Sequence, residues 1–216
     1  MKNISKMDLL VGLYMFCIAV SELMGAKTFP LIQSGWLNVN ASVAIFTIPL
    51  VFTINDMVTE VYGRERTRSI IRSGLVVVAM IFLFSLLAVS LPPSARFEPT
   101  EGAYDTVFGF SARMSFASLL AFAVAEFTDL FVFVKIRQAL GGGSLWLRNN
   151  ASNFAAQFLD TVIFMFAAFY AFDKGFGENF SFIVGLLIPY WLLKCAMSVI
   201  ETPFVYAGVA WLKRDE

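Results

Sequence analysis

The 216-residue chain contains no histidine and only two cysteines, Cys17 and Cys195. The absence of histidine excludes histidine-based metal sites, catalytic triads and proton relays. Both cysteines lie within apolar runs, so we expect buried free thiols and no disulfide framework. The chain also lacks a GxxxxGK[ST] motif and therefore has no phosphate-binding loop of its own. No motif predicts a bound metal or cofactor.

Charged residues are scarce, at 15% of the sequence against about a quarter in a typical soluble domain. Hydrophobic residues make up 58% of the chain, and 24 residues are phenylalanine. The mean hydropathy is +0.73. The formal net charge is zero, so bulk charge gives no indication of a nucleic-acid partner. This composition predicts an integral membrane protein whose main surroundings are the lipid bilayer.

Six apolar stretches are long enough to cross a bilayer, whose hydrocarbon core of about 30 Å needs about 20 helical residues. We therefore predict an all-α, polytopic membrane protein with a single transmembrane domain of six helices. The first stretch has an alternative interpretation as a cleaved signal peptide, but Glu22 and Lys27 follow it without a clear cleavage site. Pro203 predicts a kink in the last stretch. The six stretches span approximately residues 9–26, 41–62, 69–91, 111–134, 149–172 and 186–209.

Lysine and arginine are distributed unevenly between the expected loops, and cytoplasmic loops of membrane proteins carry an excess of both. One side has Lys2, Lys6, Arg64, Arg66, Arg68, Arg72, Lys135, Arg137, Arg148, Lys213 and Arg214, and the other has Lys27, Arg96, Arg113 and Lys174. An even number of helices with both termini in the cytoplasm satisfies every loop. The longest external loop, expected from Pro92 to Phe110, has the length of a lid.

Eight charged residues fall inside the apolar stretches, where each costs about 2.5–3.5 kcal/mol at a helix centre. They are Glu22, Asp56, Glu60, Glu126, Asp129, Asp160, Lys194 and Glu201. Such residues are expected to face the interior of the bundle or water, and they are candidates for function. Seven acids share one lysine, so pairing cannot neutralise most of them.

The spacing of these residues predicts a binding site at one level of the bilayer. Pairs three or four residues apart share a helix face, and the stripe from Asn150 to Asp160 keeps to one face. At a rise of about 1.5 Å per residue, four of the helices place polar groups at similar depth. As an alternative, amides can hold helices together and one acid can pair with Lys194. The candidate site residues are Asp56, Glu60, Glu126, Asp129, Asn150, Asn153, Gln157, Asp160 and Glu201.

Two segments of the sequence resemble a known family. One is Asp-Met-Val-Thr-Glu-Val-Tyr-Gly at residues 56–63, and the other is Leu-Trp-Leu-Arg-Asn-Asn at residues 145–150, followed by Gln157, Asp160 and Thr161. Together they are similar to the vitamin uptake transporter family, whose better-known members carry queuosine precursors. The resemblance covers the second to the fifth expected helix. It also implies a fold like that of the substrate-binding subunits of energy-coupling-factor transporters.

The resemblance implies an inner-membrane importer of 7-cyano-7-deazaguanine or 7-aminomethyl-7-deazaguanine, which are used to make the queuosine base of tRNA. A carboxylate can accept the adjacent N–H and amino groups of a deazaguanine, and Gln157 can serve its carbonyl edge. Two alternatives remain at this point: a binding subunit that needs a separate ATP-driven partner, and an intramembrane enzyme. The missing histidine and the lack of a nucleophile–base pair disfavour the enzyme. A homo-oligomer or an energising subunit is compatible with the sequence.

Overall fold

The computed structural model describes residues 5–34, 37–139, 158–200 and 202–215. In this part of the chain, four helical stretches are long and apolar enough to cross a membrane: Lys6–Met24, Val43–Tyr62, Arg64–Ser90 and Glu98–Ala125. The same part also contains shorter apolar helices at Phe158–Phe169, Phe176–Leu192 and Pro203–Leu212. The prediction of an all-α, polytopic membrane protein is confirmed, with one β-hairpin added to the helices.

The first helix, α1 (Lys6–Met24), begins at Ser5, whose hydroxyl accepts a hydrogen bond of 3.0 Å from the backbone N–H of Asp8. This contact satisfies one of the backbone donors that a helix start leaves open. After α1 the chain forms an antiparallel hairpin of β1 (Thr28–Ser34) and β2 (Leu37–Ser42), which the sequence analysis did not predict. The strand register shifts after Pro30, a residue that cannot donate a backbone hydrogen bond to the ladder.

The second membrane stretch is divided into two helices. A short 3₁₀ helix, η1 (Val43–Phe46), leads through Thr47 into α2 (Ile48–Tyr62). A single residue, Gly63, then joins α2 to α3 (Arg64–Ser90) with a φ of 84°. Only glycine adopts this backbone conformation without strain, so the turn brings two long helices side by side at low cost.

The next helix begins earlier than expected. After η2 (Glu98–Thr100), α4 runs from Glu101 to Ala139, so most of the segment predicted as a long external loop is helical. The acidic Glu101 in the first turn favours a helix start, because helix N-termini carry partial positive charge. Tyr104 packs on Phe108 one turn further, with ring centroids 4.4 Å apart. The prediction of an external loop from Pro92 to Phe110 is therefore wrong for its larger part.

The last helices are also displaced from their expected positions. The helix at Phe158–Phe169 is the described part of the fifth stretch, and α6 (Phe176–Ile200) begins ten residues before the expected residue 186. Asn179 ties this first turn of α6 to the preceding segment, because its amide group bonds both the N–H and the C=O of Ala171 at 2.8 Å. The helix α7 (Thr202–Leu212) begins one residue before Pro203, so the predicted break falls near that proline, and η3 (Lys213–Asp215) follows.

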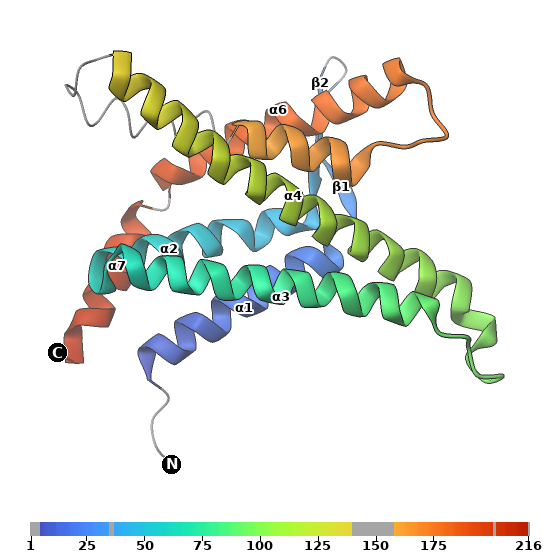
Figure 1. Cartoon of the computed structure of the whole chain (residues 1–216), viewed down its shortest axis with the longest axis horizontal. Helices are drawn as coiled ribbons and strands as arrows, with labels where there is room; N and C mark the ends of the chain where they lie inside the picture. The colour runs from blue at the N-terminus through green and yellow to red at the C-terminus, as the bar shows by residue number, and fades with distance from the viewer. Residues whose placement is uncertain (1–4, 35–36, 140–157, 201, 216) are drawn as a thin grey trace.

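The helices pack in two connected groups (Figure 1). One group consists of α1, α2, α3 and α7, and its apolar core includes Tyr14, Val58 and Leu212. The other contains α6 and the Phe158–Phe169 helix, which meet around Met165 and Ile183. The helix α4 lies along α3 and also contacts α1, while β2 packs on α6. These contacts enclose a space between the two groups.

Candidate functional site

A cavity of about 260 Å³ lies between the two helix groups and is lined by α1, α2, α3, α4, α6 and the Phe158–Phe169 helix. Most of its wall is apolar. Its volume is close to the lower end of the range of ligand pockets, about 300–1,000 Å³, and therefore suits a small solute. The polar residues on the wall are Ser21, Glu22, Ser42, Ser118, Asp160, Tyr190 and Lys194.

An ion pair lies on one side of this cavity. The Lys194 ammonium donates to Asp160 Oδ2 at 3.0 Å and to Thr161 Oγ1 at 3.1 Å. The Lys194 side chain is 13% exposed and that of Asp160 is 32% exposed. The ammonium also lies 5.8 Å from the centre of the Tyr190 ring, where a cation is attracted by the π-electrons. The pair joins the Phe158–Phe169 helix to α6.

A second carboxylate, that of Glu22 on α1, faces the same cavity. Glu22 is 8% exposed, and its Oε2 has no hydrogen-bond partner among the described residues. The carboxylate lies beside the hydroxyls of Ser115 and Ser118 on α4. Buried polar groups are nearly always hydrogen-bonded, so an unpartnered carboxylate oxygen beside a cavity indicates a place for a ligand or water.

The base of the hairpin closes one part of the cavity wall. The hydroxyl of Ser42 donates to the carbonyl of Gly25 at 2.5 Å and accepts from the N–H of Ala44 at 3.1 Å. The hydroxyls of Ser21 and Thr47 lie 2.6 Å apart, which links α1 to the start of α2. These bonds fix the position at which the chain leaves α1, and thereby the position of Glu22 one turn earlier.

The structure brings only part of the predicted site together. Asp160 lines the cavity, whereas Asp56 and Glu60 are exposed on α2 and do not contribute to its wall. Glu126 and Asp129 belong to α4, but their side chains are not among those described. The predicted site residues Asn150, Asn153, Gln157 and Glu201 lie outside the described residues.

The sequence analysis missed several residues of the cavity. Glu22 and Lys194 were identified as intramembrane charges but were not included among the predicted site residues. The structure shows that the hairpin follows directly, so the end of α1 is enclosed by other elements. The cavity residues Tyr190 and Ser118 carry no sequence signal that separates them from other tyrosines and serines in apolar helices.

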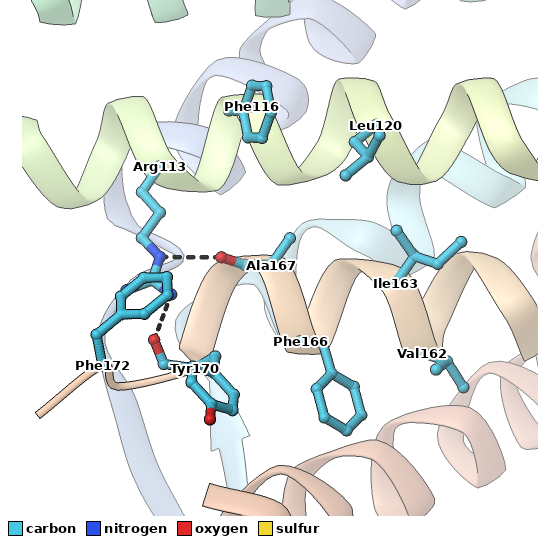
Figure 2. A pocket seen from close by; sticks show the side chains of 9 residues that line it. All are labelled: Arg113, Phe116, Leu120, Val162, Ile163, Phe166, Ala167, Tyr170 and Phe172. Atoms are coloured by element: carbon cyan, nitrogen blue, oxygen red, sulfur yellow. Dashed lines mark hydrogen bonds between the residues drawn. The ribbon is translucent and has the colours of Figure 1, made fainter. Parts of the chain in front are cut away.

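A larger groove between α4 and the Phe158–Phe169 helix has a different chemistry (Figure 2). Its volume is about 730 Å³, and its lining is almost wholly apolar. Among its described lining residues Arg113 alone is charged, and it donates to the carbonyls of Ala167 at 2.9 Å and Tyr170 at 2.5 Å. This guanidinium thus caps the end of the Phe158–Phe169 helix. The groove offers few polar groups to orient a solute, so the smaller cavity is the better candidate site.

The described residues in and around the cavity do not form a metal site. Among the described residues, no group of three or more histidine, cysteine, aspartate or glutamate side chains is placed to hold an ion. Carboxylate, ammonium and hydroxyl groups instead converge on one small volume. This combination can accept and donate hydrogen bonds to a polar, uncharged or zwitterionic molecule.

Residues 42–208 match the model of the family described as "Putative vitamin uptake transporter". The chain is also similar to a Bacillus subtilis (strain 168) protein named "Probable queuosine precursor transporter", with 28% identity over the whole chain and 89% of that protein. It is 29% identical to the "Queuosine precursor transporter" of Escherichia coli (strain K12), over 61% of this chain and 56% of that protein. No solved structure matches the chain.

Proposed function

Since the chain belongs to the vitamin uptake transporter family, we propose that it imports a queuosine precursor, 7-cyano-7-deazaguanine or 7-aminomethyl-7-deazaguanine. The protein is a transporter and not an enzyme, and it crosses the membrane several times. The names of the relatives from Bacillus subtilis and Escherichia coli support the choice of substrate. The inner membrane, with both chain termini in the cytoplasm, is the location that we propose.

The chemistry of the cavity supports this substrate, and the convergence of two carboxylates and one ammonium on a small apolar space carries the proposal. A deazaguanine presents an N–H and an amino group next to a carbonyl. A carboxylate can accept from the first two groups, and an ammonium can donate to the third. Apolar side chains such as Phe52 and Phe164 line the remainder of the cavity and suit the faces of a planar ring.

Within this site we assign direct ligand contact to Asp160; the sequence spacing predicts that Gln157, which lies outside the described residues, shares its helix face. Asp160 uses its Oδ2 to hold Lys194, and its second carboxylate oxygen remains for a ligand N–H. For the other predicted residues, substrate binding stays a prediction; they are Asp56, Glu60, Glu126, Asp129, Asn150, Asn153 and Glu201.

A genetic experiment tests the function. The gene is deleted in a strain that cannot synthesise the precursor, the precursor is supplied in the medium, and queuosine in tRNA is measured. We expect that queuosine disappears on deletion and returns when this chain is expressed. If queuosine in tRNA is equal with and without the gene, the proposed substrate is wrong. If it returns only in cells that retain a separate ATP-driven subunit, the chain is a binding subunit.

A further inference from the structure

We propose that Glu22 is the residue that selects the ligand, by accepting hydrogen bonds from the adjacent ring N–H and amino group of a 2-amino-pyrimidinone ring. The inference rests on the proposed function, because it names the group that recognises one edge of the deazaguanine. In this arrangement Asp160 positions Lys194, in addition to any contact of its own with the ligand.

The Glu22 side chain is buried and incompletely hydrogen-bonded. Glu22 is 8% exposed and faces the cavity, and its Oε2 has no hydrogen-bond partner among the described residues. The hydroxyls of Ser115 and Ser118 on α4 lie beside the same carboxylate and can donate hydrogen bonds to it. A buried carboxylate oxygen that is left without a partner beside a cavity marks a position where a ligand can donate a hydrogen bond.

The two carboxylates of the cavity differ in their charge partners. The carboxylate of Asp160 is already neutralised by Lys194 at 3.0 Å, whereas no ion pair of Glu22 exists in the described part of the chain. Lys194 donates one N–H to Asp160 and one to Thr161, and its third N–H can donate to a ligand carbonyl. Glu22 and Lys194 therefore supply the acceptors and the donor that such a ring edge requires.

The acceptor geometry of a carboxylate also matches the proposed ligand edge. An ionised carboxylate offers two acceptor oxygens side by side, and it matches two N–H groups of a ligand that are also side by side. An amide of the same size replaces one acceptor with a donor. A ligand that lacks the amino group leaves one carboxylate oxygen without a partner, and sites with buried polar groups reject such analogues strongly.

The test measures binding of two compounds to the purified, full-length protein: 7-cyano-7-deazaguanine and its analogue without the 2-amino group. We expect the wild-type protein to bind the amino compound at least about tenfold more tightly. In Glu22→Gln, affinity for that compound should fall at least about tenfold and the preference should disappear, because the amide N–H opposes the amino group. Glu22→Asp keeps both acceptors and should retain the preference with weaker binding. Glu98→Gln, at an exposed external position, is the matched control.

The outcomes separate this inference from the proposed function. If Glu22→Gln keeps the wild-type preference, Glu22 does not read the amino group, and the proposed function stands without it. If Glu22→Gln does not fold, the inference is decided by Glu22→Asp, in which loss of the preference would overturn it. If the wild-type protein binds neither compound, the proposed function fails and the assignment of Glu22 fails with it.

Discussion

At the scale of single residues, the two acids that face the cavity differ because Lys194 pairs with one of them. It neutralises Asp160, a residue 34 positions away in the sequence, and leaves Glu22 without a charge partner among the described residues. Lone acids inside a membrane are costly, so their retention points to a role in the passage of a polar molecule. Both acids face the same cavity: Asp160 is paired with Lys194, and Glu22 has no ion pair among the described residues.

We expect Asp160→Asn to reduce initial uptake of 7-cyano-7-deazaguanine at least about tenfold at low concentration, since 1.4 kcal/mol corresponds to one decade of affinity. The substitution exchanges an acceptor for a donor and removes the charge that holds Lys194, and a buried mismatch costs about 1–3 kcal/mol. Uptake into cells is the measurement, with the protein level determined alongside it. Asp173→Asn, at an exposed position outside the helices, is the matched control and should transport normally.

Normal transport by Asp160→Asn would assign Asp160 to helix packing alone.

The candidate site was predictable from the sequence only in part, for a physical reason that Asp160 illustrates. Helical spacing shows which polar side chains share one face, and it placed Asp160 correctly toward the interior. The partner of a side chain depends on how separate helices are rotated against each other, and spacing within one helix does not contain that information.

At the scale of elements, long apolar runs predicted the membrane helices well where the run is continuous, as in α3. They predicted the starts of α4 and α6 ten residues late, because Gly102, Asp105 and Gly109 lower the hydropathy of the first turns of α4. The hairpin was missed because β1 contains Pro30 and does not alternate between apolar and polar residues, although β2 (Leu37–Ser42) does. Local hydropathy thus identifies the segments that are embedded in lipid, but it does not show where their helices begin and end.

The packing of α1 on α3 gives a prediction at this scale. A Cβ atom at Gly74 would lie 2.7 Å from Cδ1 of Ile18 and 3.0 Å from Cε1 of Tyr14, whereas a Cβ at Gly12 would meet nothing within 4 Å. Gly74→Leu should therefore force the two helices apart, at a cost of about 1–3 kcal/mol for overpacking. We expect a lower thermal unfolding temperature in detergent for Gly74→Leu and little change for the control Gly12→Leu. Equal temperatures for the two variants would contradict the close approach of these helices.

At the scale of the whole molecule, the two ends of the chain lie together. The Lys6 ammonium at the start of α1 donates to the backbone carbonyl of Trp211 in α7 at 2.5 Å. The α2–α3 turn lies at the same end of the molecule as α7 (Figure 1), and Arg64, Arg66, Arg68 and Arg72 near this turn are all exposed. A membrane protein with its positive charges gathered at one end places that end in the cytoplasm.

This arrangement predicts that a reporter enzyme fused after Glu216 is active in the cytoplasm, because the end of the chain follows the basic side of the molecule. A pair of fusions measures this directly, one with an enzyme that works only in the cytoplasm and one with an enzyme that works only outside it. A fusion near Arg96, in the segment between α3 and α4, should give the opposite result. External activity after Glu216 would overturn the proposed orientation.

The central claim is that this chain alone carries a deazaguanine through the cavity that contains Glu22 and Asp160. Transport of radiolabelled 7-cyano-7-deazaguanine into liposomes that contain only the purified protein tests the claim most directly. We predict saturable uptake that exceeds uptake by protein-free liposomes and that falls at least about tenfold with Asp160→Asn at low concentration. Uptake equal to that of protein-free liposomes, with folded protein present in the bilayer, would contradict the claim.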